Sequence, residues 1–149
     1  MSKTNPIMKI RIVTPERSVF EGDVSQATLP TKDGEVTILP NHISYITSVK
    51  AGEVIIKQGS EKISIAVSGG FLEFSKNNLI VLTDTAERAE EIDLARAEEA
   101  RKRAEDIKHG RIILDDTEFA QTAAMLEKEI TRVKVARKHH TRKGINFGL

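Results

Sequence analysis

The spacing of apolar residues changes once along the chain. Up to about residue 84, apolar and polar residues alternate in short runs, whereas from about residue 93 apolar residues recur every three or four positions. The first period is that of strands and the second that of helices. The sequence therefore predicts two structurally different parts, which we place at residues 1–86 and 87–149.

The first part is predicted to consist of strands. Met8, Ile10 and Ile12 alternate with the polar Lys9 and Arg11, as in a strand with one buried face. Further strands are expected at residues 18–20, 24–29, 35–39, 43–49, 53–57, 63–67, 71–74 and 79–82. Turn residues separate nearly all of these runs, at positions 15, 22, 33–34, 40–41, 51–52, 58–59 and 77–78. Turns this frequent favour an antiparallel β-sandwich over helices or parallel crossovers.

The paired glycines Gly69 and Gly70 lack the flanking residues of a phosphate-binding loop. We expect them to form a bend between two strands.

The second part is predicted to be a two-helix hairpin. Asp93 can cap a first helix that ends near Lys108, and glycine at position 110 fits the position after a helix end. Asp115 and Glu118 form a capping-box start for a second helix. Each helix carries one apolar stripe, at residues 97, 100, 104 and 107 and at residues 119, 123, 126, 130 and 133. Because the first stripe is mostly alanine, which buries little area, we expect the hairpin to be held only weakly and to be able to open.

Composition narrows the class of protein. The 23 basic residues nearly balance the 22 acidic ones, so net charge gives no general reason to bind nucleic acid or anionic lipid. The absence of cysteine excludes disulfides and thiolate chemistry. No apolar run approaches the ~18 residues of a membrane span, and we expect a soluble protein that keeps its N-terminus.

Nothing in the sequence indicates an enzyme or a metal site. The four histidines lack metal-ligand spacing, and no Ser-His-Asp or Gly-x-Ser-x-Gly arrangement occurs. Asp93, Arg96 and Arg103 project from one side of the first helix, because steps of three and seven residues nearly complete whole turns. These three side chains form either an anion-binding cradle or a helix cap with a surface salt bridge.

The C-terminal segment is basic. Residues 130–149 contain six basic residues and no acidic one: Arg132, Lys134, Arg137, Lys138, Arg142 and Lys143. Such a segment is a solvated basic tail, a nucleic-acid contact or a contact for an acidic protein. Its only Phe, Tyr or Trp residue is Phe147, so the basic residues are not accompanied by an aromatic platform for stacking on bases.

Residues 34–42 resemble the N-terminal signature of the epsilon subunit of F-type ATP synthases. That signature runs Gly-Glu, an apolar stretch and Pro-Gly-His, and the chain matches it at residues 34–35, 38–40 and His42. Thr37 and Asn41 stand where the family usually has glycine. Further landmarks follow in order at position 52 and at residues 67–73 and 81–86, so the resemblance covers nearly the whole chain.

The resemblance implies a contact surface for protein partners. It assigns contacts with the γ subunit and the membrane c-ring to the end of the sandwich that we expect to carry Glu35 and His42. Without the family, a histidine after Pro-Asn would be expected to lie in solvent.

The resemblance also implies an ATP site. Residues 92–97 match the Ile/Leu-Asp-x-x-Arg-Ala motif by which many bacterial epsilon subunits bind ATP. Besides Asp93 and Arg96, the positions of Glu87, Arg103 and Arg132 resemble further nucleotide contacts. Lys128 replaces a family arginine, which keeps the charge but loses the planar fork of donors.

In the family, the basic residues of the last helix engage an acidic stretch of the catalytic β subunit and stop rotation. We therefore expect a non-catalytic rotor subunit that contacts γ, the c-ring and the α and β subunits, with ATP as a regulatory ligand and no required cofactor or metal. We expect the protein to lie at the cytoplasmic face of the cell membrane and to meet the membrane only through the complex. The isolated chain is expected to be a monomer that does not bind nucleic acid.

Two alternatives stay open: a free-standing nucleic-acid-binding module, and an epsilon subunit that links the rotor without regulating it.

Overall fold

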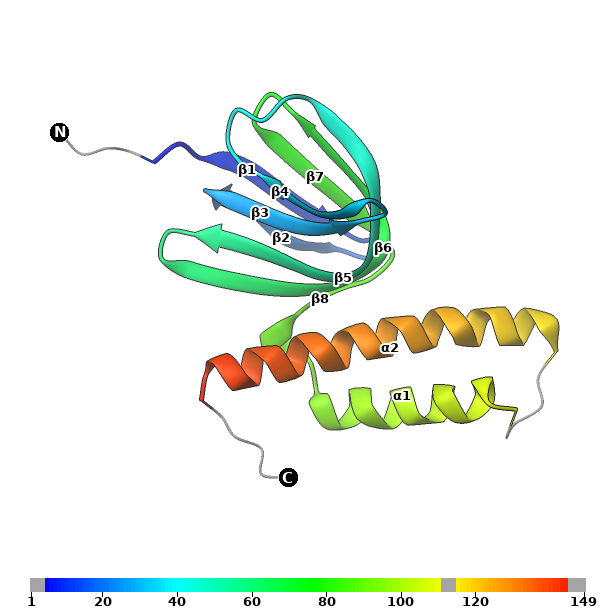
Figure 1. Ribbon diagram of the computed structural model, residues 1–149. Coiled ribbons are helices and arrows are strands. Elements are labelled where there is room, and N and C mark those ends of the chain that lie inside the picture. Colours follow the sequence, from blue (N-terminus) through cyan, green and yellow to red (C-terminus); the bar gives the residue numbers. More distant parts are fainter. Residues whose placement is uncertain (1–4, 111–114, 145–149) are drawn as a thin grey trace. The chain divides into compact units, whose positions relative to one another are not determined.

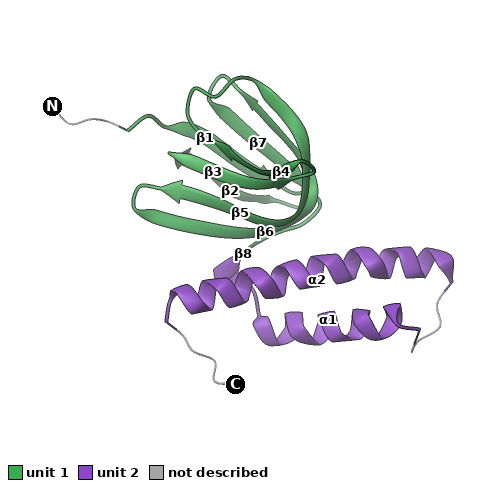
Figure 2. Cartoon of the chain, viewed as in Figure 1, with its two compact units in different colours: residues 1–88 green, residues 89–149 purple. Residues whose placement is uncertain are grey.

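The computed structural model describes residues 5–110 and 115–144 of the chain. The chain divides into two compact units, Met1–Arg88 and Ala89–Leu149 (Figure 2). We call them the N-terminal unit and the C-terminal unit and describe each by itself.

The N-terminal unit is a β-sandwich, which confirms the predicted fold class. Its strands are β1 (Met8–Val13), β2 (Ser18–Val24), β3 (Gln26–Thr31), β4 (Gly34–Ile38), β5 (Tyr45–Gln58), β6 (Glu61–Ser75), β7 (Asn78–Thr83) and β8 (Ala86–Arg88). They follow the order β2-β1-β7-β6-β5-β3-β4, with β8 paired to β6 (Figure 1). β4 therefore lies at one edge of the sheet.

The strand pairs are antiparallel with one exception, the parallel pair of β1 and β7. No short turn joins these two strands, because most of the unit's sequence lies between them, so chain connection does not impose an antiparallel arrangement. The prediction of an all-antiparallel sandwich was wrong at this pair.

The core is aliphatic. Alternate residues of β1 point inward, so that Met8, Ile10 and Ile12 are buried while Lys9 and Arg11 are exposed. The core contains few aromatic side chains, and Phe74 is the largest that is fully buried.

Two long strands replace four predicted short ones. β5 joins the segments expected at 43–49 and 53–57, and β6 joins those expected at 63–67 and 71–74. The turn expected at residues 51–52 does not exist. A Cβ on Gly52 would lie 2.8 Å from Pro30 Cγ, so this glycine serves the close approach of a neighbouring side chain.

Gly70 lies inside β6 and does not separate two strands. Its φ is +151°, and an added Cβ would lie 1.9 Å from the carbonyl oxygen of Leu82 on β7. Only glycine allows this backbone conformation together with such a close approach of β6 to β7, so Gly70 lets β6 continue through this point. Gly22 was likewise predicted in a turn and lies inside β2.

The C-terminal unit contains a short 3₁₀ helix, η1 (Ala89–Glu91), and the helices α1 (Leu94–Lys108) and α2 (Asp116–Arg142). Asp93 caps α1, since its side chain accepts a hydrogen bond from the backbone N–H of Arg96. Asp115 and Glu118 form the predicted capping box at the start of α2. α1 and α2 pack side by side as a hairpin (Figure 1).

The buried stripe of α2 differs from the predicted one. Phe119 is 46% exposed and Ala123 is exposed. The buried residues that recur at three- and four-residue steps are Thr122, Leu126, Glu129, Val133 and Ala136. Both stripes contain Leu126 and Val133, and the 3.6-residue period cannot separate two neighbouring stripes that share members.

Candidate functional site

Asp93 and Arg96 lie together at the start of α1. One carboxylate oxygen of Asp93 accepts the Arg96 backbone N–H at 3.1 Å, and the other lies 3.7 Å from Arg96 Nε. The Arg96 side chain is 85% exposed, so this ion pair contributes little to stability. The guanidinium is oriented by Asp93 and remains open to an anion from solvent.

Arg103 lies farther along α1 and is also exposed. Its Nη2 atom lies 3.4 Å from Glu99 Oε1, one helical turn earlier. The spacing from Arg96 keeps both guanidinium groups on one side of the helix, as the sequence indicated.

The two predicted nucleotide contacts on α2 are less exposed. Arg132 Nη1 donates to Glu129 Oε2 at 2.8 Å, and these side chains are only 20% and 9% exposed. Lys128 is half-buried. The sequence analysis missed Glu129: its spacing from Arg132 is visible in the sequence, but a glutamate gives no sign there that it is buried.

Glu87 differs from the other predicted contacts because it belongs to the N-terminal unit. It lies on β8, where it pairs with Ala66 of β6. The structure thus joins Asp93 and Arg96 directly and places Arg103, Lys128 and Arg132 on the same hairpin.

The six basic residues near the end of the chain all lie on α2 or at its C-cap. Lys134, Lys138, Arg142 and Lys143 are exposed. Arg132 is paired with Glu129, and Arg137 with Glu98 of α1. The absence of acidic residues from 130–149 therefore does not leave Arg132 and Arg137 without counter-charges, because Glu129 and Glu98 lie outside that range.

Glu35 and His42 do not share one end of the sandwich, as had been expected. Glu35 lies near the start of β4 opposite Pro30, whereas His42 follows the other end of that strand. What they share is the β4 edge of the sheet and the loop after it. Glu35 is exposed, and its carboxylate faces solvent from an edge strand.

His42 is half-buried, contrary to the expectation for a histidine after Pro-Asn. Its ring lies 5.8 Å from the ring of Phe74, edge-on, and 5.9 Å from that of Tyr45. Its Nδ1 is 2.8 Å from the carbonyl oxygen of Ile43. These contacts fix the imidazole on the surface at the end of β4.

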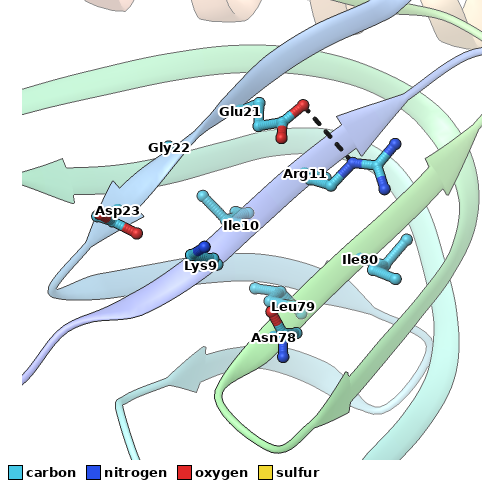
Figure 3. Close-up of a pocket in the computed structure, with 9 residues that line it drawn as sticks. All are labelled: Lys9, Ile10, Arg11, Glu21, Gly22, Asp23, Asn78, Leu79 and Ile80. Atoms are coloured by element: carbon cyan, nitrogen blue, oxygen red, sulfur yellow. Dashed lines mark ion pairs between the residues drawn. The ribbon is translucent and has the colours of Figure 1, made fainter.

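A separate hollow of about 330 Å³ lies over the outer face of β1, β2 and β7 (Figure 3). Arg11 and Glu21 form an ion pair of 3.7 Å across its upper part, and Lys9 lies opposite Asp23 in the strand register. The charges of the lining cancel, and none of the predicted site residues contributes to it. The net charge of the hollow therefore favours neither an anionic nor a cationic ligand.

In the described ranges, 5–110 and 115–144, no group of three or more His, Asp or Glu side chains is arranged to hold a metal ion. Neither helix of this part of the chain has the length and apolar character needed to cross a membrane.

Comparison with known proteins gives consistent matches. Residues 7–89 match the family described as ATP synthase, Delta/Epsilon chain, beta-sandwich domain. The chain is 47% identical over 131 residues to the ATP synthase epsilon chain of Dehalococcoides mccartyi (strain CBDB1), covering 88% of this chain and 93% of that protein. It is 40% identical over 135 residues to the ATP synthase epsilon chain of Pediococcus pentosaceus, covering 89% and 97%.

A similar fold occurs in a solved assembly. A chain in the structure of the Euglena gracilis mitochondrial ATP synthase, OSCP/F1/c-ring, superposes with a TM-score of 0.71, covering 88% of this chain and 83% of that one. Its sequence identity is 20%, so the likeness concerns the fold alone.

Proposed function

The chain belongs to the family of ATP synthase epsilon chains, and from that premise we propose that it is a central-stalk rotor subunit of a proton- or sodium-driven F-type ATP synthase. In this role it couples γ to the c-ring, performs no chemistry of its own and meets the membrane only through the complex, at the cytoplasmic face. The observation that carries the proposal is the match to epsilon chains over 88% of this chain, which includes both the sandwich and the hairpin.

The surface of the sandwich supports a role in protein contacts. Phe71 of β6 and Leu82 of β7 are register partners on the outer face of the sheet, and both are exposed. Ile43, in the loop after β4, is also exposed next to His42. Neighbouring exposed apolar side chains favour association with another protein. We assign γ and c-ring contacts to such surfaces, with Glu35 and His42 along the β4 edge.

We further propose that ATP is a regulatory ligand of the hairpin. Support comes from Arg96, which is exposed, oriented by Asp93 and part of the motif at residues 92–97, and from Arg103 on the same side of α1. Arg132 and Lys128 would add phosphate contacts from α2, and Glu87 would complete the set. A ligand that binds only the folded hairpin raises the population of that form.

The third element of the proposal is inhibition of ATP hydrolysis by the basic residues of α2 in an extended form. Lys134, Lys138, Arg142 and Lys143 are exposed on one helix and offer charge complementarity to an acidic surface of the catalytic β subunit. Arg132 and Arg137 would join them after their present partners are exchanged.

Two experiments test the proposal. The affinity-tagged chain, expressed in its own host, should capture γ, and capture of nucleic acid without γ would overturn the assignment to the rotor.

The second experiment tests the inhibitory role. Lys134→Gln combined with Lys143→Gln should raise ATP hydrolysis by the assembled complex, whereas Lys102→Gln on the exposed side of α1 should not. Equal rates for all three complexes would leave a rotor linker without regulation.

Neutralising these lysines is a sharper test than deleting residues 130–149. The deletion would also remove the buried Val133, Val135 and Ala136, so a change in hydrolysis could arise from loss of helix packing. The lysine substitutions change charge on an exposed surface and keep the packing.

A further inference from the structure

Glu98 of α1 is bound by two guanidinium groups that come from different helices. Arg101 Nε donates to Glu98 Oε2 at 3.2 Å, and Arg137 Nη2 of α2 donates to Glu98 Oε1. The Glu98 side chain is only 27% exposed. This carboxylate therefore uses each of its oxygens for one cation in a partly desolvated place.

The first cation belongs to α1 and stays with Glu98 whatever α2 does. Arg101 is three residues from Glu98, and its Nη1 also donates to Glu105 Oε1 at 2.7 Å, four residues further on. Residues at these spacings lie on one side of a helix. Glu98 is thus already oriented by its own helix before Arg137 reaches it.

The second cation makes the contact that depends on the hairpin. Separation of α1 and α2 breaks the pair of Glu98 and Arg137, whereas the pair of Glu129 and Arg132 lies within α2 and moves with it. Of these two arginines, Arg137 is the one that opening releases from its carboxylate.

From this we propose that Glu98 is an internal acidic site that holds Arg137 in the folded hairpin and competes for it with the acidic protein surface that the basic residues of α2 engage when extended. The identity of that surface rests on the proposed inhibitory function. The competition itself rests on the contacts of Glu98.

The physical argument is an exchange of one carboxylate for another. On opening, Glu98 keeps Arg101, so no unpaired buried charge is left on α1. Arg137 regains a carboxylate from the partner, so the two forms differ little in the number of charge pairs. A small difference between two states is what allows a ligand or a neighbouring subunit to decide between them.

The first test uses the full isolated chain and amide hydrogen exchange of residues in α1 and α2, which reports rare opening. Glu98→Gln should raise the opening population roughly three- to tenfold, the range of partly exposed ion pairs. Glu99→Gln is the matched control, because Glu99 carries the same charge on the same helix and pairs within α1. Arg137→Gln should match Glu98→Gln, and the double variant should open no more than either single one.

Two results would overturn the competition: opening in Glu98→Gln no greater than in Glu99→Gln, or fully additive effects in the double variant. Additivity would mean that the two side chains act independently.

The second test measures ATP hydrolysis by complexes assembled with the same variants. Glu98→Gln should strengthen inhibition by up to the same three- to tenfold factor, because it releases Arg137 to its other partner. Arg137→Gln should weaken inhibition, and adding Glu98→Gln to it should have no further effect. Glu99→Gln should behave as wild type.

The two tests separate the two claims. Coupling of Glu98 and Arg137 in exchange, with hydrolysis unchanged in every variant, would keep the internal pair and remove the inhibitory function. Hydrolysis that responds to the lysine substitutions, without coupling in exchange, would keep inhibition and remove the role of Glu98.

Discussion

Asn41 and Asn77 are joined by a reciprocal pair of hydrogen bonds. The backbone N–H of Asn41 donates to Asn77 Oδ1 at 2.6 Å, and Asn77 Nδ2 donates to Asn41 Oδ1 at 3.0 Å. Both residues have positive φ, of 65° and 59°. The loop after β4, which carries His42, is thereby tied to the turn between β6 and β7.

Replacement of Asn41 by alanine should destabilise the N-terminal unit by about 1.5–2.5 kcal/mol. It removes one hydrogen bond, and alanine, unlike asparagine, has no polar side chain that stabilises the left-handed backbone conformation. Asn41→Gly, the usual family residue, keeps the backbone conformation and should cost about 1 kcal/mol or less. Urea unfolding measures both changes. A wild-type midpoint for Asn41→Ala would show that the asparagine pair does not hold the loop.

Gly70→Ala should be among the most damaging single-methyl additions in the chain. The new Cβ would lie 1.9 Å from the Leu82 carbonyl oxygen, so β6 and β7 would have to separate, at a cost of about 3–4 kcal/mol. The control is Gly59→Ala: its φ is also positive, at 60°, but no atom lies within 4 Å of an added Cβ, so only about 1 kcal/mol of backbone strain is expected. Thermal unfolding compares them, and similar losses for the two variants would contradict the steric argument.

Arg96→Ala should weaken ATP binding by about 1.5–3 kcal/mol, the range for hydrogen bonds to a charged group, which is roughly a ten- to hundredfold loss of affinity. Lys102→Ala removes the same charge from a different side of α1 and should leave the affinity unchanged. Isothermal titration with ATP measures both. No binding of ATP by the wild-type chain up to millimolar concentration would leave Asp93 and Arg96 as a helix cap and a surface ion pair.

Lys128→Arg should tighten ATP binding if the planar guanidinium matters at this position, since lysine offers a single charged centre where arginine offers a fork of donors. The same titration tests it. Equal affinities of the two proteins would mean that charge alone acts at residue 128.

The C-terminal unit should lose stability as the pH falls. Burial lowers the pKa of His139 below its ordinary value of 6.5, helped by the positive charges of Lys143, His140 and Arg142 and opposed by Glu90. Between the lowered pKa and 6.5 the unfolded chain binds more protons than the folded one, so the free energy of unfolding decreases as pH falls through this window. His139→Gln should flatten this dependence in thermal unfolding followed by helical circular dichroism, whereas His109→Gln should retain it. A pH dependence unchanged by His139→Gln would assign the effect to other groups.

The sequence by itself determined the kind of each element and much of its local chemistry. The two-residue period of Met8, Ile10 and Ile12 gives a strand wherever one face is buried, and Asp93, Asp115 and Glu118 cap helices through contacts within four residues. The pairing of Asp93 with Arg96 belongs to the same class. Such features depend on neighbours along the chain, so they can be predicted without knowledge of the fold.

Only the tertiary structure decided the role of residues whose partners are distant in sequence. Glycine is typical of turns, but Gly52 and Gly70 lie inside the continuous strands β5 and β6. Glycine is needed at these positions because Pro30 and Leu82 on adjacent strands approach closely. Asn41 meets Asn77, and Arg137 meets Glu98, 36 and 39 residues away respectively. No periodicity or local spacing encodes these contacts, because they arise when strands pair and helices pack. For the same reason Arg137, in the basic segment of α2 that contains no acidic residue of its own, acquires its carboxylate partner Glu98 only in the folded hairpin.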